Sequence, residues 1–191
     1  MGRNICFIGT DGSGKSTIVK EIAKRVDGRK VYFGWKPFLP STKLISWIFR
    51  KKGYKIADDM NKKQKKFSFV QEIMLVYYYV EYLARYLSKI AFSSKPVVID
   101  RYFYDMYAHY DYASRSVLFK YLMRIYPKPD YIFFLDVGVE DAKKRKPEMD
   151  IELLKMHRDK YIELSEILGI KRIDTRNSVL KTVVEIMRGL R

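Results

Sequence analysis

The sequence predicts an α/β fold, a doubly wound parallel β-sheet with helices on both faces. Short apolar runs alternate along the chain with longer segments in which apolar residues recur every three or four positions. Two runs, 96–102 and 131–137, are apolar almost throughout, as expected of strands buried on both faces. The first run, ICFIG, leads directly into a glycine-rich turn and a helical stripe. This alternation is typical of a parallel sheet with crossover helices.

The expected elements follow one another in order. Five strands are predicted, at 5–9, 30–34, 96–102, 131–137 and 170–174. Helices are predicted at 15–26, after a cap at Ser41 or Thr42, and at 67–92, 104–126, 139–146, 150–168 and 177–190. The long segment 67–92 carries Phe67, Val70, Met74, Tyr78, Tyr82 and Tyr86 at helical spacing.

Length and composition indicate one domain over residues 1–191. The chain is 48% hydrophobic, which argues against disorder, and its longest apolar run has eight residues, too few to span a membrane. The beginning of the sequence lacks a signal-peptide pattern. Cys6 is the single cysteine, so no intrachain disulfide is possible. We therefore expect a cytoplasmic protein without membrane partners.

The chain carries a net charge of +16, from 38 Lys and Arg against 22 Asp and Glu. Such a charge attracts anions, including nucleotides, nucleic acids and acidic membranes. The abundance of lysine also suits a thermophile, which offers a second explanation. Eight basic and two acidic residues lie in 50–66, which we expect to be a mobile basic loop. A solvated surface is its simpler interpretation, and contact with nucleic acid is the alternative.

The segment GTDGSGKST, residues 9–17, matches the phosphate-loop (P-loop) pattern G-x-x-x-x-G-K-[ST] in full. Glycines let backbone N–H groups turn toward a phosphate, and the helix that follows adds its positive N-terminal end. Lys15 is expected to reach the β- and γ-phosphates, and Ser16 to ligate Mg²⁺. An ordinary glycine-rich turn is the alternative. The expected ATP-binding residues of the loop are Asp11, Gly12, Ser13, Gly14, Lys15, Ser16 and Thr17.

Asp100 and Arg101 end a predicted buried strand. An acid there binds Mg²⁺ directly or through water, and an arginine beside it can bind a second phosphate group. A kinase of nucleoside monophosphates needs that arginine, whereas an enzyme that transfers phosphate to water does not. A purely structural ion pair is the alternative. No N-K-x-D guanine signature is present, which argues against a GTPase.

The chain resembles the thymidylate kinase family. The resemblance covers almost the whole length and lies in GTDGSGKST, DRYFYD, PDYIFFLDVGVEDAKKR, HRDKYIEL and IDT. It implies an ATP-dependent transfer to dTMP that gives dTDP, with Mg²⁺, in a homodimer paired through tyrosine-rich helices. Asp11 is then implied to lie near the sugar 3′-hydroxyl of the acceptor, and Arg101 to bind the acceptor phosphate. Tyr102 and Tyr78 are further candidates for the acceptor site.

The same resemblance implies a lid near 138–158. Some family members carry an arginine in the loop where this chain has Gly12, and others supply the charge from basic residues of the lid. The basic run 143–146 lies where the lid begins, so Lys143, Lys144 and Arg145 are candidates, with Arg145 counted as catalytic. A plain exposed helix end is the alternative. Arg158 is a weaker candidate, as is Arg176, which we expect against adenine.

Two departures from the family pattern leave the acceptor open. The family sequence R-E-P-G-G-T is replaced by FGWKPFLPST, and the Phe-x-x-x-Arg pair that binds thymine in the family has no counterpart at the expected positions. Counting back from Asp100 without gaps leads to Val76 and Val80; a tyrosine of 77–79 could supply the ring, but Arg85 lies more than a turn further on. In the second motif, Asp105 and His109 stand where the family has a serine and a tyrosine. Another nucleotide, a nucleoside or a small phosphorylated metabolite are therefore alternative acceptors, and a nucleic-acid-binding ATPase is a third interpretation. Both histidines, at 109 and 157, are expected to be structural.

Overall fold

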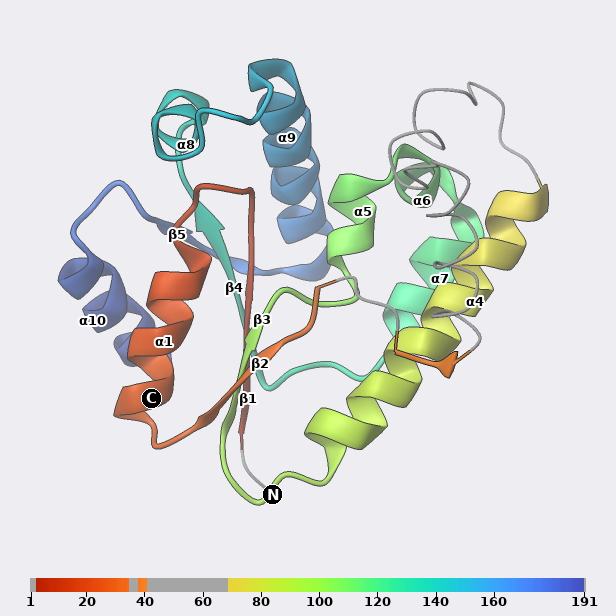
Figure 1. Cartoon of the computed structure of the whole chain (residues 1–191), viewed down its shortest axis with the longest axis horizontal. Coiled ribbons are helices and arrows are strands. Elements are labelled where there is room, and N and C mark those ends of the chain that lie inside the picture. The colour runs from red at the N-terminus through yellow and green to blue at the C-terminus, as the bar shows by residue number, and fades with distance from the viewer. Residues whose placement is uncertain (1–2, 35–37, 41–68, 191) are drawn as a thin grey trace.

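The computed structural model describes residues 3–34, 38–40 and 69–190. The helix expected after position 41 and the basic loop 50–66 lie outside these residues. The described part contains a five-stranded parallel sheet in the order β2-β3-β1-β4-β5 (Figure 1). The strands are β1 (Asn4–Ile8), β2 (Arg29–Tyr32), β3 (Val97–Asp100), β4 (Tyr131–Asp136) and β5 (Lys171–Asp174). All five predicted strands are confirmed, and β1 lies at the centre of the sheet.

Helices cover both faces of the sheet (Figure 1). One face is covered by α1 (Lys15–Arg25) and α10 (Val179–Gly189). The other carries α4 (Phe69–Tyr86), the π-helical turn η1 (Leu87–Ala91), α5 (Asp105–His109), α6 (Asp111–Arg115), α7 (Val117–Ile125) and α9 (Ile151–Leu168). The short helix α8 (Val139–Arg145) follows β4 above the sheet edge. None of the described helices is long and apolar enough to cross a membrane.

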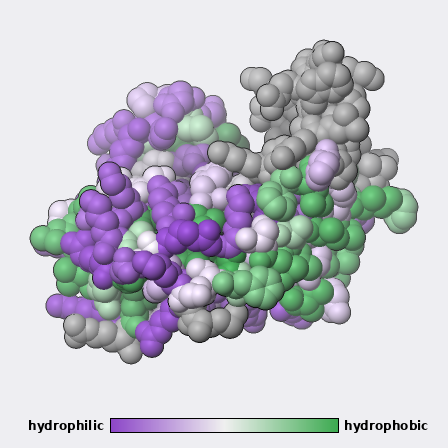
Figure 2. Space-filling model, turned by 60° about the horizontal axis from the view of Figure 1, so that its bottom comes forward, coloured by the Kyte–Doolittle hydropathy of each residue, from purple (hydrophilic) through white to green (hydrophobic). Residues whose placement is uncertain are grey.

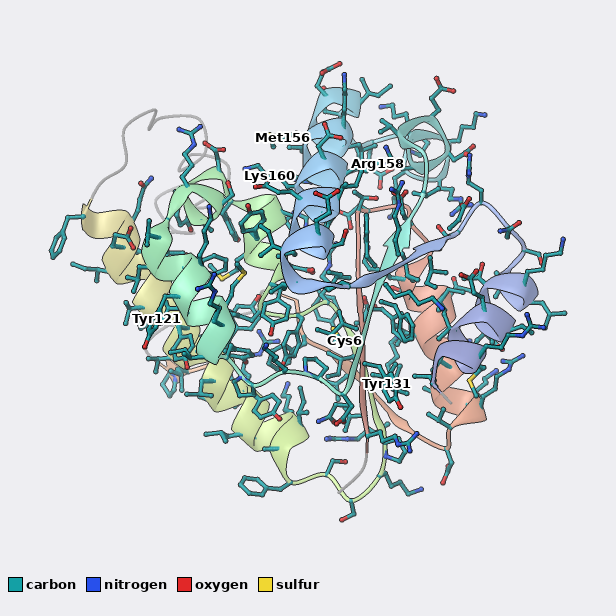
Figure 3. All side chains as sticks on the ribbon, turned by 180° about the vertical axis from the view of Figure 1, so that it is seen from behind. Cys6, Tyr121, Tyr131, Met156, Arg158 and Lys160 are labelled. Carbon is teal, nitrogen blue, oxygen red and sulfur yellow. The ribbon has the colours of Figure 1, made fainter. Side chains whose placement is uncertain are left out.

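Alternation along β1 divides the core into its two halves. Ile5 and Phe7 pack with α1 and α10, whereas Cys6 and Ile8 pack on the opposite face with the aromatic residues of α4 and α5. All four side chains are buried, as a central parallel strand requires. Figure 3 shows Cys6 in the middle of the sheet with side chains around it. The buried cysteine is thus a packing residue, as its position in the first strand predicts.

The segment expected as one helix over 104–126 is three helices. Its first break is at Tyr110, whose φ of −122° and ψ of 113° are those of a strand. The second break is at Ser116, whose hydroxyl caps α7 by accepting a hydrogen bond from the amide of Phe119 at 2.9 Å. The Ser116 hydroxyl in turn donates to the carboxylate of Glu72 on α4. A serine that caps a new helix therefore ends the continuous helix that the periodicity indicates.

Candidate active site

The phosphate loop follows β1 and turns into α1 at the carboxyl edge of the sheet. Gly9 and Gly12 have φ values of 148° and 81°, which side-chain-bearing residues rarely adopt. A Cβ atom on Gly9 would come 2.4 Å from the carbonyl oxygen of Leu135, and one on Gly12 would come 2.7 Å from that of Ala142. The loop therefore fits only with glycine at these two positions. Ala142 belongs to α8, so this helix packs directly on the loop.

Lys15, the first residue of α1, is folded back over the loop. Its ammonium donates hydrogen bonds to the carbonyl oxygens of Gly9 at 2.8 Å and Thr10 at 2.6 Å, and to the hydroxyl of Ser13 at 3.3 Å. Burial and the nearby charge of Arg101 lower the pKa of Lys15 to about 8. An anionic phosphate in the loop would favour the charged ammonium, because it adds a counter-charge to a site from which water is largely excluded.

Ser16 and Asp100 meet between β1 and β3. The Ser16 hydroxyl donates to Asp100 Oδ2 at 3.0 Å, and Asp100 is buried at the end of β3. One hydroxyl and one carboxylate are oxygen ligands of the kind that Mg²⁺ takes alongside water and phosphate oxygens. The described residues contain no cluster of three or more His, Cys, Asp or Glu side chains able to hold a metal by themselves. The donor set fits a Mg²⁺ ion that arrives with a nucleotide.

Arg101 begins the chain beyond β3 in a left-handed conformation, with φ of 70°. Its amide donates to the carbonyl oxygen of Phe7 at 2.9 Å, which ties this unusual backbone to β1. The guanidinium forms an ion pair with Asp11 of the phosphate loop through Nη2, and only 14% of the side chain is exposed. The structure thus brings the predicted acceptor arginine directly against the phosphate loop.

Arg145 connects α8 to the phosphate loop. At the last position of α8, it donates to the carbonyl oxygen of Gly12 at 3.2 Å and to that of Thr175 at 3.1 Å. The guanidinium thereby connects the phosphate loop with the turn after β5. Beneath it lies a cavity of about 220 Å³, whose lining includes Ser13, Gly14, Thr17, Arg145, Thr175 and Asn177. The cavity thus lies between the phosphate loop and the turn after β5.

Comparison with known proteins agrees with this geometry. The sequence profile described as thymidylate kinase matches residues 7–186. The chain belongs to the thymidylate kinase family. Among its relatives, a probable thymidylate kinase of Methanocaldococcus jannaschii is 32% identical over 94% of this chain and 90% of the relative. A probable thymidylate kinase of Sulfurisphaera tokodaii is 26% identical over the same shares of the two chains.

Solved structures show the fold of this kinase. Thymidylate kinase from Ehrlichia chaffeensis superposes with a TM-score of 0.65 over 100% of this chain and 99% of that one, at 17% identity. Deoxyadenosine kinase from M. mycoides superposes with a TM-score of 0.61 over 98% of both chains, at 16% identity. At these identities the likeness concerns the α/β architecture, which the P-loop and the parallel sheet had predicted.

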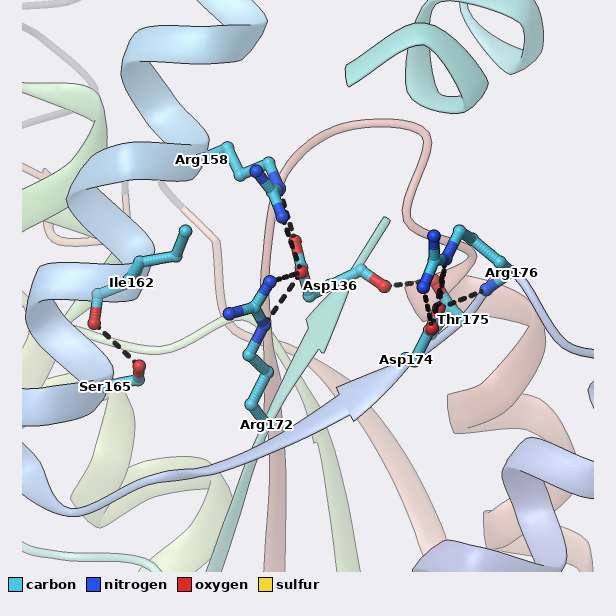
Figure 4. A network of polar contacts seen from close by, with 8 residues as sticks. All are labelled: Asp136, Arg158, Ile162, Ser165, Arg172, Asp174, Thr175 and Arg176. Atoms are coloured by element: carbon cyan, nitrogen blue, oxygen red, sulfur yellow. Dashed lines mark hydrogen bonds and ion pairs between the residues drawn. The ribbon is translucent and has the colours of Figure 1, made fainter. Parts of the chain in front are cut away.

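Two basic residues predicted to bind ATP have partners within the protein, and their contact with ATP stays a prediction. Lys143 donates to the carbonyl oxygens of Pro147 at 2.7 Å and Met149 at 2.6 Å, so it holds the turn between α8 and α9. Arg176 pairs with Asp174 beside it, and lines a separate cavity of about 330 Å³ rather than the one beneath Arg145 (Figure 4). Of the basic residues considered in the lid and beyond β5, the structure brings only Arg145 onto the phosphate loop.

Arg158 has a structural partner that the sequence did not indicate. It donates from Nε to Asp136 Oδ1 at 2.8 Å, and Arg172 pairs with the same carboxylate (Figure 4). Asp136 ends β4, and its own carbonyl accepts from the hydroxyl of Thr175 at 2.9 Å. The two arginines thus connect α9 and β5 to the end of β4, just before α8 begins.

Neither tyrosine proposed for the acceptor site is exposed. Tyr102 is fully buried, packs its ring 5.4 Å from that of Phe33, and donates its hydroxyl to the carbonyl of Pro127 at 2.6 Å. The hydroxyl of Tyr102 therefore faces the core, and the contact of this residue with the acceptor stays a prediction. Tyr78 is also buried, with its ring stacked 6.5 Å from Tyr110. These rings belong to the aromatic core between α4 and the sheet.

The gap-free count along α4 leads to two residues on the outside of the helix. Val76 and Val80 lie on the outer, exposed face of the helix. The inner face carries Glu81 and Arg85, both buried. Glu81 accepts from the backbone amide of Leu39 at 3.2 Å, and Arg85 donates to the carbonyl oxygen of Gly34 at 3.0 Å. These two charged side chains hold the segment that replaces the family sequence after β2.

Two further polar residues contact Arg101. Asp105 and His109 accept from its Nη1 atom at 3.3 Å and 2.8 Å, and both lie on α5. Their spacing of four and eight residues from Arg101 was the signal available in the sequence, because such residues fall on one side of a helix. Since helix α5 begins only at Asp105, the spacing alone did not show that they face the arginine.

Proposed function

We propose that this kinase transfers the γ-phosphoryl group of ATP to dTMP, forming dTDP and ADP. The observation that carries the proposal is the contact between Arg101 and Asp11, which sets a cation for an acceptor phosphate beside the loop that holds ATP. Bringing two anionic phosphates together is the task of a nucleoside monophosphate kinase. Membership of the thymidylate kinase family supports dTMP as the acceptor.

In the proposed reaction the protein positions and neutralises charge. The loop amides and Lys15 hold the phosphates of ATP, Arg101 binds the acceptor phosphate, and Arg145 turns from the carbonyls of Gly12 and Thr175 toward the transferring group. An oxygen of the acceptor phosphate then bonds to the γ-phosphorus as the bond to the ADP oxygen breaks. That oxygen is already anionic, so no strong general base is needed. Asp11 would accept a hydrogen bond from the acceptor's sugar hydroxyl, as the family resemblance implies.

Ser16 and Asp100 would hold the Mg²⁺ that accompanies ATP. When bound, the ion neutralises charge on the β- and γ-phosphate oxygens. Asp100 is a suitable ligand because β3 fixes its backbone and burial excludes competing water. Gly14, Thr17 and Ser13 would line the nucleoside side of the same nucleotide.

A panel of acceptors tests the proposal. The protein is incubated with Mg-ATP and with dTMP, other nucleoside monophosphates, nucleosides and small phosphorylated metabolites, and ADP is measured. Acceptor-dependent ADP with dTMP as the best substrate is expected. If another acceptor gives the highest kcat/KM, the enzyme is a kinase of the same fold with a different acceptor. If no acceptor gives ADP, the kinase proposal is wrong, and binding of DNA or RNA that weakens steeply with salt would support the nucleic-acid alternative.

We also propose that the kinase forms a homodimer through an apolar face on α4 and α7. Exposed apolar residues follow α4 at helical spacing, at Phe69, Ile73, Val76 and Val80, and α7 at Val117, Tyr121 and Ile125. Figure 2 shows apolar side chains gathered on the side of the molecule where Figure 1 places α4. Figure 3 shows Tyr121 on the outer side of α7. The two helices contact each other, so the stripes form one continuous surface.

Light scattering after size-exclusion chromatography tests the dimer. The protein is expected to elute at twice its 22.8 kDa mass, and Ile73→Glu to elute as a monomer. Ile167→Glu, an equally exposed isoleucine on α9, is the matched control and should remain dimeric. A monomeric parent protein would contradict the proposal. The cytoplasmic location and the thermophilic origin expected from composition stay predictions, tested by imaging a fluorescent fusion and by a melting curve.

A further inference from the structure

The guanidinium of Arg101 is held from two sides, which use different nitrogen atoms. Nη2 pairs with Asp11 of the phosphate loop. Nη1 donates to Asp105 Oδ2 at 3.3 Å and to His109 Nε2 at 2.8 Å. Because Nη1 carries two hydrogens, α5 uses both of them. No described residue accepts a hydrogen bond from Nε, so the edge formed by Nε and Nη2 is the side on which a phosphate can bind in a bidentate manner.

The bond to Arg101 fixes the tautomer of His109. A guanidinium only donates, so His109 Nε2 accepts and the ring proton lies on Nδ1. Burial and the neighbouring Arg101 lower the pKa of His109 well below its ordinary value, so the ring is neutral. His157 lies against it with ring centroids 4.4 Å apart, and Tyr161 of α9 approaches the same nitrogen at 3.2 Å. The histidine is thereby packed in one orientation.

Asp105 accepts a hydrogen bond from Arg101 as a charged carboxylate, and His109 accepts one as a neutral ring. Asp105 is buried, and it is ionised at neutral pH because its pKa, raised by burial, is about 6. With Asp11 it already gives two carboxylates to one guanidinium. A third carboxylate in place of His109 would add negative charge where an anionic phosphate must enter, whereas a neutral ring nitrogen satisfies the remaining hydrogen without doing so.

The stem of Arg101 is confined as well. A Cβ atom on Gly34 would lie 2.8 Å from Arg101 Cδ and 2.3 Å from the hydroxyl of Tyr32, so the chain after β2 packs closely on the arginine. The backbone of Arg101 is fixed by its bond to Phe7. The backbone, the aliphatic part of the side chain and Nη1 are thus all fixed. The Nε–Nη2 edge of the guanidinium therefore points in one direction, toward the phosphate loop.

We propose that Asp105 and His109 are positioning residues for the acceptor phosphate: by holding Nη1 they present the Nε–Nη2 edge of Arg101 to it. The inference rests on the proposed function for the identity of the ligand, but the positioning itself is a property of the protein alone. The family pattern has serine and tyrosine at these two positions, so the pair is a feature of this chain.

Arginine side-chain ¹⁵N NMR tests the positioning without turnover. The Arg101 signals, assigned with Arg101→Lys, should show separate Nη1 and Nη2 resonances because rotation about the Nε–Cζ bond is slow. The double variant Asp105→Asn with His109→Phe should average them. Tyr107→Phe is the matched control, because it removes another α5–α9 hydrogen bond, that of Tyr107 to Glu163 at 2.6 Å, without touching Arg101. Averaged signals in the parent protein, or separate signals in the double variant, would overturn the proposal.

Kinetics with the best acceptor then test the consequence. Asp105→Asn and His109→Phe should each raise KM for the acceptor about tenfold or more, with KM for ATP unchanged, since misplacing a substrate-binding group by about 1 Å has effects of this size or larger. His109→Gln keeps an acceptor oxygen and should restore much of the loss. Equal effects on both substrates, or a similar effect in Tyr107→Phe, would show a structural role only. If no acceptor is turned over, the proposed function fails while the NMR result still decides the positioning.

Discussion

The phosphate loop and helix α4 pack on the same sheet, but they hold their surroundings in opposite ways. In the loop the backbone does the binding: glycines bring amides and carbonyls to the surface, and Lys15 folds onto those carbonyls. On α4 the backbone is satisfied within the helix, and the side chains of Glu81 and Arg85 reach out to bind the backbone of the segment after β2.

The difference teaches where each region is sensitive. A loop made of backbone tolerates almost no change of residue type at its glycines, because an added atom meets another main chain. A helix is sensitive to register, because one residue of shift turns a side chain by about 100° around the axis. Changes at the loop should therefore affect every acceptor alike, and changes on α4 should depend on the face they alter.

The largest effect is expected from Lys15→Ala. Removing the ammonium leaves the phosphates of ATP without their main buried cation, so kcat should fall by roughly 1,000-fold with every acceptor. Lys143→Ala removes a lysine whose ammonium bonds to the turn between α8 and α9, and as the control it should stay within a few-fold of the parent. Steady-state kinetics with two acceptors measure both. A loss confined to one acceptor would contradict the role of the loop.

Arg101→Ala should act on the acceptor side. The loss of a charged hydrogen-bond donor is expected to lower kcat/KM for the acceptor roughly 100-fold. KM for ATP should change little, since Lys15 and the loop amides remain. The measurement is a pair of substrate-saturation curves. Unchanged acceptor kinetics would show that Arg101 does not bind the acceptor.

Gly12→Ala tests the packing of helix α8 on the phosphate loop. The new methyl group would meet the backbone of Ala142 at 2.7 Å, so α8 must move away and carry Arg145 with it. We expect kcat to fall about tenfold. Gly138→Ala, at the other end of α8, is the control, because its methyl group would lie 3.7 Å from Asp141 Oδ2, an ordinary contact. A fully active Gly12→Ala enzyme would mean that close packing of α8 on the phosphate loop is not needed for turnover.

Asp105→Asn should change how stability depends on pH. Burial raises the pKa of Asp105 to about 6, whereas in the unfolded chain it is 3.8. The folded protein therefore keeps a proton that the unfolded chain releases, and stability falls as pH rises between about 4 and 6. The variant lacks this proton, so relative to it the parent should lose about 1–3 kcal/mol over that interval. Urea unfolding at several pH values measures this, and parallel profiles would contradict it.

The smallest effect is expected from Val76→Ala and Val80→Ala. Both side chains face outward, on the surface proposed for the dimer, so acceptor selectivity in the panel should be unchanged. Measured in the monomeric Ile73→Glu background, the free energy of unfolding should change by about 0.5 kcal/mol or less. Leu75→Ala, on the buried face of the same helix, is the contrasting variant and should cost about 2–5 kcal/mol. A change in base preference in either valine variant would contradict the expectation that this outer face of α4 does not contact the acceptor.

These regions also differ in what could be predicted from sequence. Short motifs predict the phosphate loop, the strand before it and the helix after it, because their geometry is local. They also predict the acid–arginine pair at the end of β3, because neighbouring strands fix its position. The contacts of Asp136 with Arg158 and Arg172 join three distant elements, and no local pattern indicates them. Tyr102 directly follows the motif arginine, yet it points into the core because the chain turns sharply at Arg101.

The left-handed backbone of Arg101 has a consequence for how stability and activity are divided at this position. A residue with a Cβ atom loses about 1–2 kcal/mol in such a conformation, and glycine does not. Glycine at position 101 would relieve the strain in the main chain, so the domain should be more stable with glycine there than with alanine. The same substitution would remove the side chain that pairs with Asp11. Thermal stability and the proposed binding of the acceptor therefore place opposing demands on residue 101, and arginine is the less stabilising choice.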